Sequence, residues 1–310
     1  MSMLLVQALN GLQFGVLLFL VAAGLSLVFG VMDLINLAHG VQYMLGAYVA
    51  ATLGVWTGSF WLGALLALPV ALLVGLALEW LVFRHLYRRD HLSQVLATFG
   101  VILTVEEATR ALWGSAPQTV LEPSGLSGGP MGGVEIVPGL IYPTYRLVII
   151  GVGIVVPLLL WFLVERTRAG MLVRAGATHP AMVSALGVDI RRLFTIVFAF
   201  GAMLAGFAGA LASPVFPVAP GMGDTVLILC FVVIVIGGVG SIRGAFIAAL
   251  LVGLLDSVGR AMLPDLLRLL LDPSSARQTG AALASMLVYI VMAGILFFRP
   301  AGLFPGGRSA

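Results

Sequence analysis

The sequence predicts an all-α fold: a polytopic membrane bundle of eight to ten transmembrane helices, some of them broken or re-entrant. Three observations support this prediction. Of the 310 residues, 61% are apolar and only 9% are charged, against about a quarter in an ordinary soluble domain. The mean hydropathy is +1.13. Charge-free stretches such as 1–32 and 34–78 exceed the roughly 20 residues that one membrane-spanning helix needs. These observations exclude a soluble globular protein.

The charge-free stretches define the expected spans in chain order. Polar residues and glycines interrupt several of them, and such irregular backbone is tolerated in a membrane only inside protein or beside a cavity. The first apolar run is too long for a signal peptide and has no basic region before it, so we expect it to be retained. The expected spans are 8–31, 40–58, 60–83, 92–113, 146–164, 193–213, 225–241, 244–262 and 281–298.

The positions of the arginines predict the orientation of the bundle. The net charge is only +3, and the arginines are spread over separate short loops, which the positive-inside rule explains better than nucleic-acid binding. Loops 114–145 and 214–224 carry no arginine, so we expect them on the side opposite to the cytoplasm. Nine spans place the N-terminus outside, and eight or ten place it inside. The arginines expected in the cytoplasm are Arg84, Arg88, Arg89, Arg166, Arg168, Arg174, Arg191, Arg192, Arg299 and Arg308.

Several kinds of chemistry are excluded by residues that the chain lacks. All 16 basic residues are arginines, so the chain contains neither a Walker A phosphate loop nor a Schiff-base lysine. Cys230 is the single cysteine, which excludes an internal disulfide and a multi-cysteine metal site. The four histidines are scattered along the chain. We therefore expect no catalytic residue, no metal and no cofactor in this chain, and any ATP-driven step must lie on another chain.

Small residues four positions apart predict where helices approach closely. Helices in lipid associate through close backbone contact, which glycine and alanine permit. Each row is also compatible with simple packing that has no further role. The residues expected at helix contacts are Gly46, Gly54, Gly201, Gly209, Gly237, Gly238 and Gly240, with Ala245, Ala249 and Gly253 forming a further row.

The densest polar interruption of an apolar run lies at residues 33–43. Polar groups at membrane depth are costly, so they need a partner or a function. One interpretation is a broken helix beside a translocation path, to which Asn36, His39 and Gln42 offer hydrogen bonds. The other is a turn at the membrane surface, in which Asn36 and His39 cap helix ends.

The carboxylates within the spans have two interpretations. Arg110 follows Glu106 and Glu107 by four and three residues on one expected helix, so local ion pairs lower the cost of burial. Glu79 is expected to pair with Arg84 or to lie at the membrane interface. The alternative is a proton or ion relay through these carboxylates, as in a secondary transporter or channel.

Segment 165–192 differs from its surroundings because it is long, polar and basic. It is either the largest cytoplasmic loop and nothing more, or a surface segment that docks into a partner's groove. A short helix is expected with Pro180 near its start and Gly187 at its end, because proline suits the first helical turn and glycine the position after the last.

Short motifs occur in a characteristic order and spacing through almost the whole chain. They include Asn10-Gly11, Ala23-Gly24-Leu25, Asn36-Leu37-Ala38-His39-Gly40 and Met44-Leu45-Gly46-Ala47-Tyr48, then Gly170, Arg174-Ala175, Pro180 and Gly187-Val188, and finally Gly237-Gly238-Val239-Gly240-Ser241 and Phe298-Arg299-Pro300-Ala301-Gly302-Leu303-Phe304. In this order they resemble the permease subunits of ABC importers for branched-chain amino acids, specifically the shorter, H-type of the two paired permeases.

The resemblance implies one transmembrane permease domain over 1–310, with a cytoplasmic coupling loop at 165–192 and a periplasmic loop at 114–145. It implies a bacterial inner-membrane importer in which this chain pairs with a second homologous permease, two cytoplasmic ATPase subunits that bind ATP and Mg, and a periplasmic substrate-binding protein. The residues expected to couple to the ATPases are Arg174, His179, Pro180 and Gly187, and those expected to line the substrate path are Asn36, His39, Gln42 and Glu106.

The chain departs from the family pattern at three positions. His179 stands where an acidic residue is common, Val183 where an alanine is common, and Leu229 where a lysine is often found. Related permeases serve urea, short amides, or aromatic and aliphatic acids, so the resemblance leaves the substrate open. An ion-coupled secondary transporter remains the alternative from another class.

Overall fold

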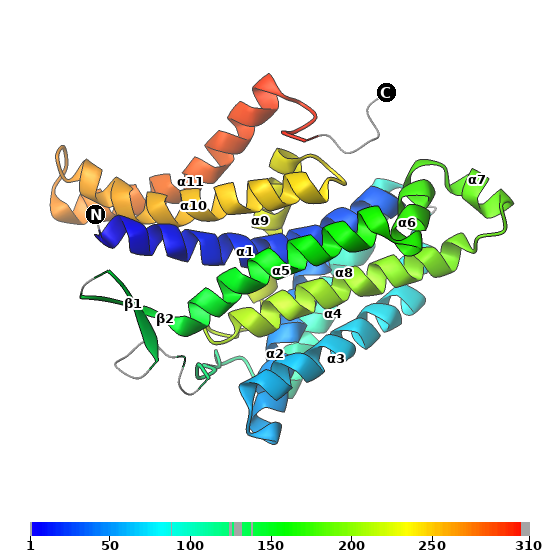
Figure 1. The fold of residues 1–310 in the computed structure, drawn as a ribbon, viewed down its shortest axis with the longest axis horizontal. Helices are drawn as coiled ribbons and strands as arrows, with labels where there is room; N and C mark the ends of the chain where they lie inside the picture. The colour runs from blue at the N-terminus through cyan, green and yellow to red at the C-terminus, as the bar shows by residue number, and fades with distance from the viewer. Residues whose placement is uncertain (1, 88, 124–125, 127–131, 138, 305–310) are drawn as a thin grey trace.

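The computed structural model describes residues 2–87, 89–123, 126, 132–137 and 139–304. Over this part of the chain it is a helical bundle with one small hairpin (Figure 1). Each of the nine expected spans coincides with a helix, which confirms the predicted fold class. The elements are α1 (Ser2–Met32), α2 (His39–Thr57), α3 (Phe60–Leu81), η1 (Phe83–His85), α4 (His91–Trp113), β1 (Gly133–Val137), β2 (Leu140–Pro143), α5 (Thr144–Arg166), α6 (Arg168–Thr178), α7 (Pro180–Ala185), α8 (Ile190–Ala212), α9 (Met222–Gly237), α10 (Ile242–Leu267) and α11 (Pro273–Phe298).

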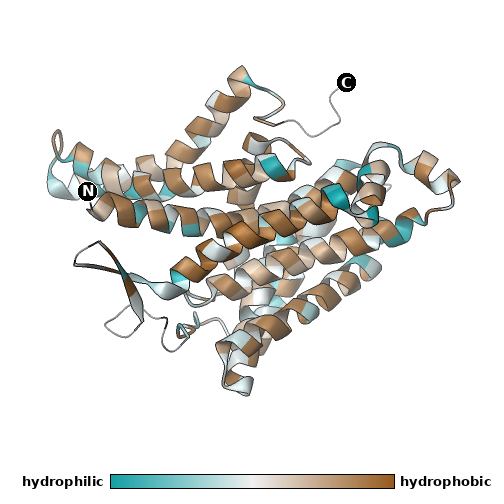
Figure 2. Cartoon of the chain, in the orientation of Figure 1, coloured by the Kyte–Doolittle hydropathy of each residue, from teal (hydrophilic) through white to brown (hydrophobic). Residues whose placement is uncertain are grey.

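Length and hydropathy single out six of the described helices as able to cross a membrane by themselves. They are α1, α3, α5, α8, α10 and α11. Helix α9 is apolar but has only 16 residues, and α4 carries Glu106, Glu107 and Arg110 in its second half. Figure 2 shows apolar residues along the helices and hydrophilic ones concentrated at their ends. With α2, α4 and α9 added to these six, the arrangement is compatible with the predicted eight to ten helices.

The connecting loops gather at two ends of the bundle. At the arginine-rich end, Ile35 after α1 meets Gln94 of α4, and Leu303 after α11 bonds to Ile236 of α9. At the other end, here called the N-terminal end, Tyr142 bonds to Asn10 of α1, and Gln118 pairs with Val218. The loops 84–91 and 165–192 therefore lie at the end opposite to 114–145 and 214–224, and the connection between α10 and α11, with Arg268, lies at the N-terminal end. Arg88, Arg308 and parts of loop 114–145 lie outside the described residues.

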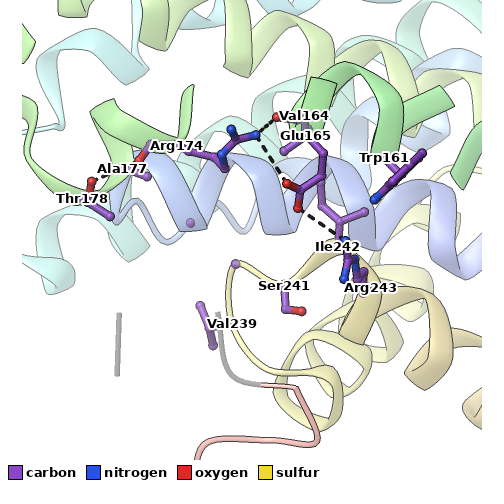
Figure 3. A pocket seen from close by; sticks show the side chains of 12 residues that line it. Trp161, Val164, Glu165, Arg174, Ala177, Thr178, Val239, Ser241, Ile242 and Arg243 are labelled. Atoms are coloured by element: carbon purple, nitrogen blue, oxygen red, sulfur yellow. Dashed lines mark hydrogen bonds and ion pairs between the residues drawn. The ribbon is translucent and has the colours of Figure 1, made fainter. Parts of the chain in front are cut away.

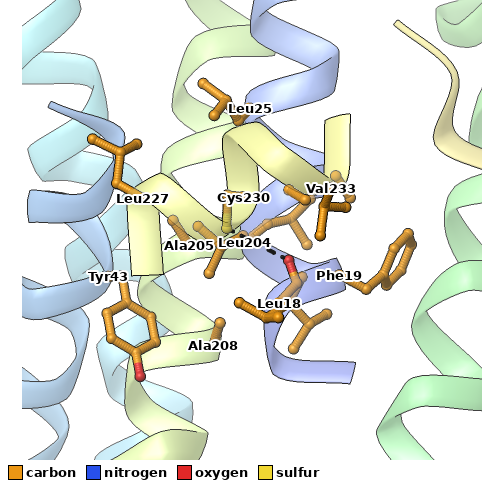
Figure 4. Packing of buried hydrophobic residues seen from close by; sticks show 14 of the residues in the cluster. Leu18, Phe19, Leu25, Tyr43, Leu204, Ala205, Ala208, Leu227, Cys230 and Val233 are labelled. Atoms are coloured by element: carbon orange, nitrogen blue, oxygen red, sulfur yellow. Dashed lines mark hydrogen bonds between the residues drawn. The ribbon is translucent and has the colours of Figure 1, made fainter. Parts of the chain in front are cut away.

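Helix α1 forms the centre of the bundle. Its most apolar window is 78% buried and that of α8 is 61% buried, whereas the four other spanning helices reach at most 28%. Figure 4 shows the packing between α1, α8 and α9, with Leu18 beside Leu204 and the lone Cys230. The Cys230 thiol is fully buried, and its Sγ–H points to the carbonyl of Leu18 at 3.7 Å. Burial of this apolar surface inside protein fixes the relative positions of the three helices.

Glycines bring several helix backbones into direct contact. Gly46 of α2 lies against Gly206 of α8, and Gly209 of α8 lies against the carbonyl of Tyr43, where there is no room for a Cβ atom. The other residues expected at helix contacts lie as follows: Gly54 beside Gly63 of α3, Gly201 beside Gly24 of α1, Gly237 beside Gly244, Gly238 beside Phe304, Gly240 beside Gly30, and Gly253 beside Gly11 and Gly15. These approaches make van der Waals contact between helices possible without large side chains.

The sequence did not predict the β-hairpin inside loop 114–145. Strands β1 and β2 are antiparallel, with an irregular register between Glu135 and Val137. The chain after the hairpin is anchored to the bundle, because the Tyr142 hydroxyl donates to Asn10 Oδ1 at 3.0 Å and the Tyr145 hydroxyl donates to the Leu211 carbonyl at 2.7 Å. Two strands of five and four residues give too short an alternation of polar and apolar residues to stand out in a glycine-rich loop.

Candidate functional site

A break in the helical backbone separates α1 from α2 at the arginine-rich end. Residues 33–38 are not helical, and Asp33 has a φ of 54°, a left-handed conformation that is uncommon outside glycine. Helix α2 then begins at His39 without a side-chain cap, and its N-cap position is Ala38. Side chains of Asn36 and His39 therefore do not cap α2, and the capping interpretation of these two residues is wrong for this helix.

Asn36, His39 and Gln42 are all buried, the first two completely. The His39 Nε2–H donates to the Val21 carbonyl on α1 at 3.1 Å, which leaves Nδ1 as an acceptor. Both side-chain polar atoms of Asn36 lack hydrogen-bond partners in the described structure, whereas the Gln42 side chain interacts with His39. Buried polar atoms are nearly always paired in proteins, so a buried asparagine without partners beside a His39–Gln42 pair marks an unusual site.

Gln94 is a buried residue of this region that the sequence analysis did not single out. Its Oε1 accepts the backbone N–H of Ile35 at 3.2 Å, and its Nε2 donates to the carbonyls of Leu86 and Arg89. One side chain of α4 thereby ties the break after α1 to the loop after α3. The N-cap of α4 lies four residues earlier, at Asp90, where hydrogen bonds from Ser93 lower the pKa of the carboxyl. A glutamine early in a helix gives no signal of such a role without the tertiary contacts.

Glu106 does not join the polar segment at 33–42. It lies twelve residues after Gln94 on α4, about 18 Å along the helix, near Gly221 at the start of α9. Its carboxylate is 3.9 Å from Arg110, which also pairs with Glu107, as the sequence predicts. Glu106 therefore lies apart from Asn36, His39 and Gln42 and does not form one small site with them.

The carboxylate of Glu79 is bound within the protein. Glu79 is buried on α3, and it accepts hydrogen bonds from Arg84 at 3.2 Å and from the Tyr87 hydroxyl at 3.0 Å. The predicted pair with Arg84 is confirmed. A buried charge is stable only with such partners, and this arrangement holds the end of α3 to the arginine-rich loop that follows it.

Segment 165–192 contains two short helices. Thr167 caps α6 by accepting from the Gly170 N–H at 3.1 Å, His179 occupies the N-cap position of α7, and Pro180 is its first residue. The predicted helix from Pro180 to Gly187 is thus present.

Gly187 ends α7 in a left-handed conformation with a φ of 90°. The Gly187 N–H donates to Ser184, and the Val188 N–H donates back to Val183, which is the hydrogen-bond pattern of a Schellman motif. The termination of this helix therefore depends on a backbone conformation that glycine adopts freely and other residues adopt at a cost in free energy.

A cavity of about 380 Å³ lies where α6 meets the ends of α5 and α1 and the start of α10 (Figure 3). Glu165 stands between two arginines, with its carboxylate 3.8 Å from Arg174 and 3.7 Å from Arg243. Arg174 also donates to the carbonyl of Val164. These contacts connect α6 to α5 and α10, so a displacement of α6 would move charges that two of the long helices share.

The chain after α11 folds back onto the turn between α9 and α10. The Leu303 and Phe304 N–H groups donate to the carbonyls of Ile236 and Gly237 at 2.8 and 3.0 Å. Gly238 and Gly240 have φ values of 101° and 77°, and the tail packs against Gly238. The Gly237–Ser241 and Phe298–Phe304 motifs, about 60 residues apart in the chain, therefore form one structural unit at the arginine-rich end.

A bundle of long apolar helices, with a buried polar break and charged surface helices at one end, defines a multi-pass membrane protein. The family model described as the permease component of branched-chain amino acid transport systems matches residues 7–296. The chain belongs to this family, as a transport subunit and not a catalytic enzyme.

Curated relatives cover most of the chain. The high-affinity branched-chain amino acid transport system permease protein BraD of Pseudomonas aeruginosa is 30% identical over 269 residues, covering 84% of this chain and 87% of the relative. LivH of Escherichia coli K12, with the same description, is 30% identical, covering 83% and 86%. A probable LivH of Methanocaldococcus jannaschii is 28% identical, covering 78% and 76%. No solved structure shows a significant match.

Proposed function

We propose that this chain is a permease subunit of an ABC importer that moves branched-chain or related amino acids from the periplasm to the cytoplasm across the bacterial inner membrane. The observation that carries the proposal is a family match over residues 7–296, with relatives named as high-affinity branched-chain amino acid permeases over more than four fifths of the chain. The concentration of arginines in the loops 84–91 and 165–192 supports an orientation with the arginine-rich end in the cytoplasm.

The proposed complex contains a second homologous permease, two ATPase subunits that bind ATP and Mg, and a periplasmic substrate-binding protein. The absence of lysine supports separate ATPases, because a P-loop needs a lysine for the nucleotide phosphates. A further relative, the E. coli permease protein LivM, is 26% identical and covers 92% of this chain. The likeness to LivM supports pairing with a homologous but different permease.

Helices α6 and α7 are the proposed contact with the ATPases. Both helices lie at the arginine-rich end, where α7 projects from the bundle (Figure 1). The residues expected to make the contact are Arg174 on α6, and His179, Pro180 and Gly187 in α7 or at its ends. The Arg174–Glu165–Arg243 contacts connect this segment to α5 and α10. Motion imposed on α7 by a closing ATPase pair would pass through α6 into the long helices.

The proposed substrate path passes the break at 33–38. A zwitterionic substrate needs hydrogen bonds for its carboxylate and ammonium groups where it leaves water. The buried polar side chains of Asn36, His39 and Gln42 can supply them. Glu106 lies too far along α4 for the same contact, so its proposed place is nearer the N-terminal end of the path.

We expect alanine substitution of Asn36, His39 or Gln42 to lower the uptake rate about tenfold, because each loses a hydrogen bond to a charged substrate group. Initial rates of radiolabelled leucine uptake into proteoliposomes measure the effect. His85→Ala, which removes an exposed histidine at the same end, is the matched control. Wild-type rates in all three variants would show that the polar segment has only a structural role.

Co-purification and transport together test the proposed function. Affinity-tagged chain, expressed with the genes beside its own, is expected to bring down two ATPase subunits and a second permease. Reconstituted complex is expected to accumulate leucine only with ATP and the binding protein. Leucine uptake by this chain alone, driven by an ion gradient, would refute the proposal and favour an ion-coupled transporter using Glu79, Glu106 and Glu107.

A further inference from the structure

A second cavity, of about 360 Å³, opens at the N-terminal end of the bundle. Helix α1 supplies one wall through residues three apart, Gln7, Asn10 and Gln13, and α10 supplies the opposite wall through Asp256 and Arg260. Arg146 of α5 and the apolar Phe14, Val215 and Phe216 complete the lining. Its volume lies within the usual range for small-molecule sites.

The walls of this cavity are held rigidly by glycine contacts. Gly11 of α1 lies against Gly253 and Leu254 of α10, and Gly15 lies against Ala249. The Ser257 hydroxyl adds a cross-link by donating to the Gln7 carbonyl at 2.9 Å. Because the backbones of α1 and α10 touch, the polar groups on both sides keep a fixed separation.

Two buried donors in the cavity have no acceptor in the described structure. Gln13 is only 2% exposed, and its Nε2 is unpaired; the Nε–H of Arg146 is likewise buried and unpaired. Arg146 Nη1 donates to Asn10 Oδ1 at 2.7 Å and the guanidinium also bonds to the Tyr142 hydroxyl, but no carboxylate among the described residues forms an ion pair with this arginine. Unpaired donors beside an uncompensated guanidinium are complementary to a carboxylate.

The opposite wall carries the complementary charge. Asp256 is mostly buried and is bonded by Arg260 through both carboxylate oxygens at 2.9 and 3.0 Å. A carboxylate has about four lone-pair sites, so acceptor capacity remains for a further donor such as an ammonium group. Phe14 and Phe216 meet edge to face at 6.0 Å and form an apolar surface nearby.

We propose that this cavity binds an α-amino acid with an apolar side chain, with Arg146 and Gln13 on its carboxylate, Asp256 on its ammonium group, and Phe14, Val215 and Phe216 around its side chain. The site lies at the end opposite to the polar break, so it is a place where substrate is received before it reaches residues 33–42. The role of this site in transport rests on the proposed function. The binding of an amino acid rests on the cavity alone.

The test compares Arg146→Gln and Asp256→Asn with wild type in two assays. In leucine uptake by the reconstituted complex, each variant is expected to raise KM about tenfold with the maximal rate little changed, because one charged contact to the substrate is lost. Arg277→Gln, an exposed arginine of α11 at the same end that does not line the cavity, is the control. Arg146→Lys is expected to recover part of the affinity because it keeps the positive charge.

The second assay measures binding of radiolabelled leucine to the purified full chain in nanodiscs. Leucine is expected to compete far better than 4-methylpentanoate, which lacks the ammonium group, or 3-methylbutylamine, which lacks the carboxylate. The Asp256→Asn variant should discriminate less against 4-methylpentanoate, because the partner of the ammonium group is lost. The Arg146→Gln variant should discriminate less against 3-methylbutylamine, because the partner of the carboxylate is lost. A change in folding alone would affect both competitors alike and would not give each variant a loss of discrimination against a different competitor.

The outcomes separate this inference from the proposed function. A wild-type complex that transports leucine while both variants keep its KM and competitor profile would overturn the cavity assignment and leave the importer intact. A chain that binds leucine through Arg146 but supports no uptake would leave the site standing and refute the transport role. Wild-type chain that binds no leucine would refute the site.

Discussion

Replacing Gly187 with valine is expected to lower substrate uptake at least about tenfold while the complex stays assembled and continues to hydrolyse ATP. Gly187 has a φ of 90°, and a side chain there costs about 1–2 kcal/mol. A Cβ atom would meet no neighbour within 4 Å, so the cost is conformational and not a clash. The variant loses the turn that ends α7, and with it the fixed direction of the proposed coupling segment. Uptake and ATP hydrolysis, measured on the same reconstituted sample, give the ratio that detects uncoupling.

Asparagine at the same position is the matched control. It adopts the left-handed conformation more readily than other non-glycine residues, so Gly187→Asn is expected to retain most of the uptake. Both substitutions add a side chain into open space, and they differ mainly in their backbone preference. Equal, wild-type coupling in the valine and asparagine variants would show that the end of α7 does not transmit motion.

The largest loss of stability is expected from Gly209→Ala. A Cβ at this position would overlap the Tyr43 carbonyl and lie 3.0 Å from the Ala47 nitrogen, both backbone atoms of α2. Neither can move without displacing the helix, so we expect destabilisation of about 3 kcal/mol, at the upper end for overpacking. Gly209→Leu is expected to yield no folded protein. Unfolding of the purified chain in detergent, followed by circular dichroism, measures the difference.

Two other helical glycines provide the control for Gly209. Gly100 in α4 and Gly151 in α5 have no heavy atom within 4 Å of an added Cβ. Alanine at either position is expected to be neutral or to stabilise by up to about 1 kcal/mol, through its better helix propensity. Destabilisation of Gly100→Ala as large as that of Gly209→Ala would contradict the assignment of the α2–α8 contact.

Hydrophobic run length predicted the helices of this fold because each span must bury its own backbone hydrogen bonds in lipid. The boundaries followed less closely: α1 begins at Ser2, not at residue 8, and α10 continues through Pro264 to Leu267. The break at 33–38 was also foreseen, since polar residues interrupt an apolar run there. The hairpin was missed because its strands are short and lie in a loop without regular periodicity.

The candidate site was predicted only where local sequence determines it. The polarity of Asn36, His39 and Gln42 marks them in the chain, and the ion pairs of Arg110 follow from helical spacing. Gln94 and Arg146 could not be recognised, because their significance depends on which helices lie beside α4 and α5. Glu106 was predicted to line the same path as the polar segment. It lies twelve residues after Gln94 on α4, a separation that residue type alone does not reveal.

The single thiol of Cys230 makes the chain a natural background for spectroscopic labels. It is fully enclosed between α1, α8 and α9, so a water-soluble maleimide reagent would leave it unmodified in the folded protein. A cysteine introduced at exposed Met182 on α7 would then be the only reactive site. Distances from such a probe to its counterpart in a second copy or partner would report the movement of α7 in the proposed ATP cycle without removing the native cysteine.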